Sequence, residues 1–447
     1  MEPDDIYSSE EKRYFKSVYF PAIFPLCAPV QIPDLSGTHP TPLGLATVRM
    51  GFSTRISVVV VAVLTSEAVP IGGLGVVSDL PVVLIKGRFY DVASSAQPAP
   101  ASEGTAQTTE STQVIEAARK LVEGNGSQQD RKDRAANLRR LRAFRATYGE
   151  VPVRIGSSIG TAAGEDRGTA GLYLKSSIGV RLLTAAHVAT PPLLDFDMGE
   201  PRSQYIFPRG GSIASPSRLD CIKKMERLLR DDKPDVHQKL TSWLTAANRV
   251  CGTVQCGRLG VDEEEYREDW ALIELQDGFV GNNRTWRAKE ELEELMIESG
   301  LVRPRGEFTG KIVGVEDPVL ETTDVWFKDR ASTGWTVGTL ISTEVELFLR
   351  GTTFGVTDSD AVHPSNIEKG KVHMMQGKPD EPFAKGGDSG SGVFKITQDG
   401  CNFVFGGMVL SEFISPTGLV LLTMVAPATR VLAQVAKATG VEWAVEV

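Results

Sequence analysis

The chain has few cysteines for its length. Among 447 residues there are five, at Cys27, Cys221, Cys251, Cys256 and Cys401. Small secreted domains held by a disulfide framework carry cysteine at much higher density, so the sequence excludes that class. Cys251 and Cys256 lie close together, but no Cys or His cluster with metal-ligand spacing accompanies them, so we expect no metal site. Free buried thiols are expected, which favours a reducing compartment.

Long apolar runs are also missing. The N-terminal stretch MEPDDIYSSEEKRYFK is acidic and lacks the apolar core of a secretory signal. The most apolar segment, 56–85, is broken by prolines and glycines, and its uninterrupted core of about ten residues is shorter than the roughly 20 that a spanning helix needs. We therefore expect buried β-strands in this segment, no membrane partner, and an intracellular, cytoplasmic location.

The charge balance and the motif content exclude other partners. The net charge of −9 gives no general support for nucleic-acid binding. A basic helical pattern occurs within 113–149, but such a helix more often docks by its apolar stripe and keeps its charges solvated. The sequence contains no Walker loop and no dinucleotide fingerprint, so no cofactor is expected.

Composition divides the chain into four parts. Residues 1–92 form a β-leaning region whose role the sequence does not reveal. Residues 93–112 are small, polar and proline-bearing, which is typical of a flexible linker. Residues 113–149 contain two helical patterns and are interpreted as a helical connector. The remaining domain, 150–447, contains every motif that carries chemistry.

Three short motifs in this domain supply the residues of nucleophilic catalysis. LLTAAHVA contains His187, EDWALIEL contains Asp269, and KGGDSGSGVF contains Ser389. A serine hydroxyl needs a neighbouring base, and histidine, with an ordinary pKa of about 6.5, can accept and return a proton near neutrality. Each motif alone has a simpler explanation: the Ser389 motif fits a polar turn, His187 fits a core histidine, and Asp269 fits a charge at a strand edge. The interpretation therefore rests on the three together, in the order His, Asp, Ser.

This order, with these local surroundings, resembles the chymotrypsin-like (trypsin-like) serine proteases over roughly residues 150–435. The resemblance implies that Ser389 is the nucleophile, His187 the general base and Asp269 the orienting carboxylate. It further implies an oxyanion hole formed by the N–H groups of Gly387 and Ser389. The expected function is a serine endopeptidase that acts on protein or peptide substrates through an acyl-enzyme on Ser389.

The resemblance also implies a fold and a substrate pocket. The expected fold is mainly β: a chymotrypsin-like double β-barrel with helical insertions and a C-terminal helix, beside a separate N-terminal β-leaning region. Counting back from the nucleophile places Phe383 at the pocket floor, and the wall is expected to contain Leu410, Ser411 and Glu412. No acidic residue stands at the floor, which favours an apolar or small substrate side chain over Lys or Arg. Glu412 either restores some preference for a basic side chain or faces solvent.

Local patterns predict the elements around these motifs. Residues 168–175 and 179–188 are expected to form a strand pair, and 334–358 resembles the hairpin that precedes the nucleophile loop. Three strand-like runs follow Ser389. A helix is predicted for 427–440, with Pro427 in its first turn and Gly440 as its C-cap. A helical insertion is expected between His187 and Asp269, over 215–250.

Two departures from the family pattern leave alternatives open. Ser391 stands where the family has a second glycine, and RIGSSIG (154–160) lacks the usual Ile-Val-Gly-Gly start of a freed amino terminus. Asp388, which would meet that terminus, then needs an internal partner. One alternative function is a catalytically weak protease-fold module that binds peptides. Another is an esterase or acyltransferase that uses the same three residues.

Overall fold

The part of the chain that can be described is discontinuous. In the computed structural model it comprises residues 44–53, 56–65, 76–77, 80–86, 88–91, 152–162, 167–189, 204–206, 211–220, 250–285, 292, 296, 308–319, 324–330, 334–350, 367–377, 381–415 and 420–446. Before residue 152, only strand backbones are described. The predicted linker and helical connector lie outside this part of the chain. So does most of the expected insertion, of which 218–220 are helical.

In the first sheet, the strand directly before His187 lies beside the strand that contains Asp269. Its order is β21-β8-β9-β13-β12-β11-β6-β7, and β10 pairs with β12. Strands β9 and β13 are antiparallel, with Thr184 opposite Ala271 and Leu183 opposite Leu272. The strands are β6 (Ser158–Thr161), β7 (Gly168–Thr169), β8 (Leu172–Ser176), β9 (Gly179–Thr184), β10 (Gln204–Ile206), β11 (Ser212–Ala214), β12 (Val250–Val261), β13 (Arg267–Leu275) and β21 (Ala444–Val445).

The second sheet closes on itself. Its order runs β15-β18-β19-β20-β17-β16, and an additional pairing of β15 with β16 joins the two ends into an antiparallel barrel of six strands. Strand β14 adds to β19 in parallel. The strands are β14 (Ile312–Val315), β15 (Val325–Arg330), β16 (Gly334–Arg350), β17 (Ile367–Gly377), β18 (Gly392–Ile396), β19 (Phe403–Ile414) and β20 (Val420–Pro427).

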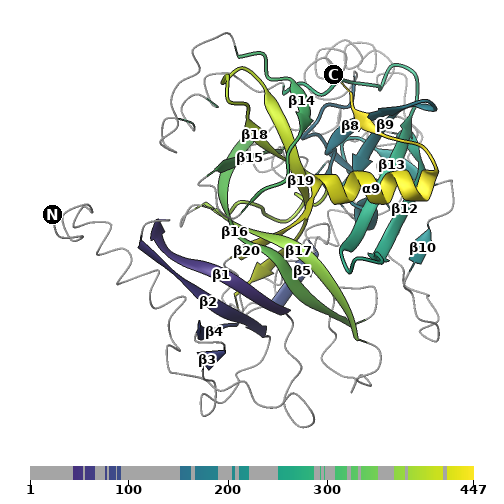
Figure 1. Ribbon diagram of the computed structural model, residues 1–447. Coiled ribbons are helices and arrows are strands. Elements are labelled where there is room, and N and C mark those ends of the chain that lie inside the picture. Colours follow the sequence, from purple (N-terminus) through teal and green to yellow (C-terminus); the bar gives the residue numbers. More distant parts are fainter. Residues whose placement is uncertain are drawn as a thin grey trace, which may run out of the picture.

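The N-terminal strands join this second sheet. They are β1 (Gly44–Ser53), β2 (Ile56–Thr65), β3 (Val76–Val77), β4 (Leu80–Lys86) and β5 (Arg88–Asp91). Strand β1 pairs with β16 and continues the sheet through β2, β4 and β3, as the purple strands of Figure 1 show. Strand β5 instead pairs antiparallel with the end of β19, with Asp91 opposite Ser411 and Arg88 opposite Ile414.

The C-terminal helix is confirmed almost to the residue. Helix α9 (Ala428–Thr439) follows Pro427 and ends at Gly440, whose left-handed φ of 72° lets its N–H donate to the carbonyl of Ala436. The buried face includes Val431 and Val435. Figure 1 shows the helix in yellow, and it packs against β19, β20 and β13, so it bridges the two sheets.

One buried core holds the two sheets together. Its residues come from both, such as Leu172 and Trp270 from the first sheet and Phe405 and Met408 from the barrel. Within the barrel, Trp335 stacks on Phe403 with ring centroids 5.4 Å apart. The continuous core fixes the first sheet against the barrel, and the candidate site lies where they meet.

The expected fold class, a mainly β chymotrypsin-like double barrel with a C-terminal helix, is confirmed. The expectation that the N-terminal strands form a separate region is wrong, because β1 pairs with β16 and β5 with β19. The strand-like runs after Ser389 are β18, β19 and β20. The hairpin predicted within 334–358 is wrong, because 334–350 is one long strand whose hairpin partner is β17. Segment 56–85 contains strands as expected, and no helix in the described part of the chain is long and apolar enough to cross a bilayer.

Candidate active site

His187 and Asp269 are brought together by adjacent strands. His187 lies on the one-turn helix α5 (Ala186–Ala189), directly after β9, while Asp269 lies in β13. The imidazole Nδ1 is 2.7 Å from Asp269 Oδ2, and the backbone N–H of His187 donates to Oδ1 at 3.2 Å. An ionised carboxylate accepts only, so this contact fixes Nδ1 as the protonated nitrogen and directs Nε2 away as an acceptor.

The Asp269 carboxylate is fully buried, and its environment keeps it ionised. Burial alone would raise its pKa, but the attraction and hydrogen bond of His187, the charge of Arg267 and the His187 N–H together lower it below the ordinary value of 3.8. A lowered pKa means that the carboxylate's contribution to stability is present above the ordinary value. That contribution to stability is lost only as the pH falls through the lowered pKa of the folded protein.

Ser389 lies in the loop between β17 and β18 and is completely buried. Its Oγ donates to the carbonyl of Leu410 at 2.9 Å. Its own carbonyl accepts the N–H of Thr169 at 2.8 Å, which ties the loop to strand β7 of the first sheet. The structure therefore places Ser389 at the junction of the sheets, with its hydroxyl directed to Leu410 rather than to His187.

Two N–H groups of this loop are oriented by the carbonyls that share their peptide planes. A trans peptide points its N–H opposite to its carbonyl. The Asp388 carbonyl accepts the N–H of Ser391 at 2.9 Å, which sets the direction of the Ser389 N–H. The Gly386 carbonyl accepts Nη2 of Arg167, which sets the Gly387 N–H. Neither N–H has an acceptor within the described residues.

Gly387 is held in a conformation that favours glycine. Its φ is +98°, and a Cβ there would lie 2.5 Å from Nε of Arg167. Ser391, which replaces a family glycine, is accommodated: its N–H reaches the Asp388 carbonyl and its own carbonyl accepts from Val409 at 2.9 Å. The loop thus closes as a hydrogen-bonded turn with serine at this position.

Asp388 has an internal partner. Its Oδ2 lies 2.6 Å from Nζ of Lys328 on β15, and both side chains are essentially inaccessible to solvent. The same oxygen accepts the N–H of Lys385 at 2.8 Å. Lys328 is therefore the internal partner that the sequence required for Asp388.

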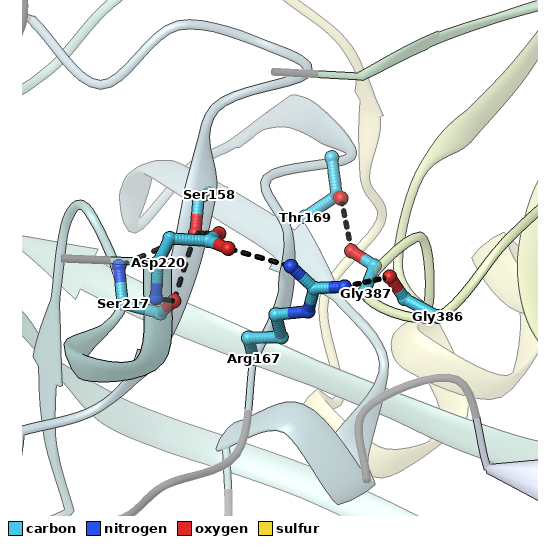
Figure 2. A network of polar contacts seen from close by, with 7 residues as sticks. All are labelled: Ser158, Arg167, Thr169, Ser217, Asp220, Gly386 and Gly387. Carbon is cyan, nitrogen blue, oxygen red and sulfur yellow. Dashed lines mark hydrogen bonds and ion pairs between the residues drawn. The ribbon is translucent and has the colours of Figure 1, made fainter. Parts of the chain in front are cut away.

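Figure 2 shows a second group of polar contacts on the other side of the loop, centred on Arg167. Sequence reasoning missed both Arg167 and Lys328. Each is a single cation on or beside a strand, with no motif around it, so no local signal could have found them.

The residues expected to form the substrate pocket are all buried. Phe383 belongs to a small core cluster with Trp326 and Val409, and its ring fills the space beside Gly338 of β16. Leu410, Ser411 and Glu412 follow one another on β19. The carbonyl of Leu410 accepts the Ser389 hydroxyl, and Ser411 and Glu412 lie opposite β5. Among the described residues, no three His, Cys, Asp or Glu side chains are grouped so as to hold a metal ion.

Comparison with known proteins adds fold neighbours only. No family model matches the sequence, and no curated protein matches it either. Among solved structures, the chain is similar to protease A of Thermobifida fusca, with 13% identity over 66% of this chain and 100% of that one, at a TM-score of 0.33. It is also similar to a glutamic-acid-specific serine protease, with 14% identity over 66% of this chain and 100% of that one, at a TM-score of 0.34. The chymotrypsin of Cellulomonas bogoriensis has 13% identity over 65% of this chain and 97% of its own, at a TM-score of 0.32.

Proposed function

We propose that this protein is a serine endopeptidase that hydrolyses peptide bonds through an acyl-enzyme on Ser389. The observation that carries the proposal is the paired contact of His187 with the buried Asp269 carboxylate, at 2.7 Å through Nδ1. That contact leaves Nε2 as the basic atom of the imidazole. The two oriented N–H groups of Gly387 and Ser389 support the same chemistry, because tetrahedral intermediates of acyl transfer need such donors.

The reaction begins with rotation of the Ser389 hydroxyl away from Leu410. As Oγ attacks the peptide carbonyl carbon, its proton passes to Nε2 of His187, and the carbonyl oxygen becomes an oxyanion bound by the two N–H groups. Collapse of this intermediate breaks the C–N bond, and the imidazolium returns the proton to the leaving amine. Water then repeats the sequence on the acyl-enzyme and releases the acid.

The side-chain preference is proposed to be apolar or small. Phe383, the residue six before Ser389, carries no charge and is packed in the small cluster with Trp326 and Val409. Glu412 is fully buried and so does not face solvent in this state. A carboxylate on the pocket wall would also favour a basic substrate side chain, so the profile of cleavage products decides between these preferences.

A second candidate is a protease-fold module that binds peptides without turnover. It is favoured by one observation: the Ser389 hydroxyl is fully buried and donates to Leu410. In this candidate the loop keeps its shape, but the nucleophile does not engage His187. Peptide binding that survives Ser389→Ala, with no cleavage in either protein, would support it.

Covalent labelling with a fluorophosphonate probe tests the enzyme proposal on the full-length protein. We expect labelling at Ser389 that Ser389→Ala and His187→Ala both abolish, because an ordinary serine hydroxyl does not react at a useful rate. Ser391→Ala is the matched control, since Ser391 is a buried serine two residues away whose loss should leave labelling intact. Absence of labelling, or labelling that persists without Ser389, would overturn the proposal.

A further inference from the structure

A buried polar network reaches the nucleophile loop from the first sheet. Arg167 precedes β7, and its Nη1 lies 2.6 Å from Oδ1 of Asp220. The second oxygen of Asp220 accepts the hydroxyl of Ser158 on β6. Ser217 contacts both Ser158 and Asp220: its Oγ lies 3.0 Å from the Ser158 hydroxyl and accepts the Asp220 N–H at 3.3 Å. Figure 2 shows Ser158 and Ser217 around Asp220, whose carboxylate contacts the guanidinium.

The network holds the guanidinium rigidly against the loop. The Arg167 side chain retains only 15% of its exposure and that of Asp220 24%. On the far side, Nη2 donates to the Gly386 carbonyl, and the guanidinium lies directly over the Cα of Gly387. A planar cation with one edge on a carboxylate and another on a carbonyl has little rotational freedom.

The peptide between Gly386 and Gly387 is the one whose orientation this contact decides. Gly387 can adopt a wide range of backbone angles, so the peptide plane on its N-terminal side has no steric lock of its own. If the plane turned over, the Gly386 carbonyl would point where the Gly387 N–H now points. An anionic oxygen could not bind at a site occupied by a carbonyl oxygen.

We infer that Arg167, held by Asp220, is a positioning residue that keeps the Gly387 N–H directed into the oxyanion site. The inference rests on the proposed function. Arg167 acts on the Gly386 carbonyl, and the peptide plane transmits the effect. The network also couples residues 217–220, which lie ahead of the long segment before β12, to the nucleophile loop.

The test compares variants on both sides of this contact in the full-length protein. Arg167→Met removes the donor to Gly386 and is expected to lower kcat roughly 100-fold with KM unchanged, since a misplaced catalytic group costs about that much. Arg167→Lys, which can still donate to the carbonyl, is expected to recover part of the loss. Asp220→Asn should give an intermediate loss, because the amide oxygen can still accept from the guanidinium but no longer carries the charge that strengthens the contact.

Thr169→Val is the matched control. The Thr169 hydroxyl donates at 2.9 Å to the carbonyl of Gly387, the residue after the one that Arg167 contacts. That peptide carries the N–H of Asp388, which donates to Lys385 and not to the oxyanion site. Its loss should therefore change kcat much less than the loss of Arg167.

The outcomes separate the two proposals. If the unaltered protein does not react with the fluorophosphonate probe, the enzyme proposal itself fails. If it reacts, and folded Arg167→Met reacts at the same rate with unchanged kcat, Arg167 is not a positioning residue. Equal losses in Arg167→Met and Thr169→Val would likewise contradict the inference, because they would indicate general damage to the loop. Thermal unfolding of each variant identifies any that do not fold.

Discussion

At the scale of single residues, the most consequential contact outside the proposed triad is the ion pair of Lys328 with Asp388. Removing two charges from water is costly, and their attraction repays that cost only when both are present and hydrogen-bonded. Here the Asp388 oxygen accepts from both the ammonium and a backbone N–H. The pair anchors the turn directly before Ser389 to strand β15, so nucleophile geometry depends on a side chain far away in sequence.

Lys328→Met should lower the free energy of unfolding by roughly 3–5 kcal/mol, because it leaves the Asp388 carboxylate buried without its cation. The double variant Lys328→Met with Asp388→Asn should lose clearly less, since it buries no unpaired charge. Denaturant unfolding of both variants and of the unaltered protein measures the difference. If the double variant were no more stable than the single one, the pair would not act as a coupled buried contact.

The sequence was informative at this scale where the chemistry is local. His187, Asp269 and Ser389 each lie in a short motif, and the structure places the first two in contact. Lys328 and Arg167 carry no such motif, because a lone cation on a strand is indistinguishable from a solvated surface charge until its partner is known. The direction of the Ser389 hydroxyl is a rotamer, which no residue pattern encodes.

At the scale of secondary-structure elements, helix α9 shows how terminal residues set length. Pro427 fixes the entry with a φ of −61°, and Gly440 ends the helix in the left-handed region. A Cβ at Gly440 would meet no atom within 4 Å, so a larger residue fits without steric conflict. Any cost of substitution there is conformational.

Gly440→Ala should therefore destabilise the protein by about 1 kcal/mol, the cost of placing an L-residue in the left-handed region. Gly440→Asn should cost less, because asparagine enters that region more readily. Thermal unfolding of the two variants compares them directly. A larger loss for asparagine than for alanine would show that something other than backbone conformation decides the stability of this cap.

Elements with local signals could be predicted, and elements defined by distant partners could not. The runs after Ser389 and the capped helix 427–440 were found because alternation, proline and glycine are local features. Segment 334–358 was predicted to be a hairpin from the family resemblance, with Gly351 and Gly355 near its end. Its actual partner, β17, begins beyond Arg350 at Ile367, and no property of 334–358 reveals which strand will pair with it.

At the scale of the whole molecule, the N-terminal strands belong to the sheet whose loop contains Ser389. Strand β5 pairs with β19 at Ser411, one residue beyond the carbonyl that accepts the Ser389 hydroxyl. It runs antiparallel to β19, towards the nucleophile. An edge of a strand can pair only once, so an extended peptide could use this stretch of β19 only by displacing β5.

Phe89→Pro with Tyr90→Pro should therefore raise the rate of peptide hydrolysis about fivefold. The N–H groups of adjacent strand residues point in opposite directions, so the pair loses one hydrogen bond to β19, which weakens β5 by roughly 1 kcal/mol. Labelling by the small fluorophosphonate, which needs no strand edge, should stay the same. Val76→Pro with Val77→Pro is the control, because β3 pairs with β4 at the far end of the sheet. Unchanged hydrolysis in the β5 variant, or an equal rise in the control, would contradict this prediction.

Strand β21 has a consequence for how the molecule is made. Its residues Ala444 and Val445 pair with Lys175 and Leu174 of β8, so an early strand of the first sheet gains this partner only after all the barrel strands have been synthesised. Asn283 joins the same junction by bonding the carbonyls of Tyr173 and Glu446. Contacts between such distant parts of a chain form slowly. Because β21 follows β20 in sequence, His187 and Asp269 leave the ribosome well before this edge of the first sheet can pair.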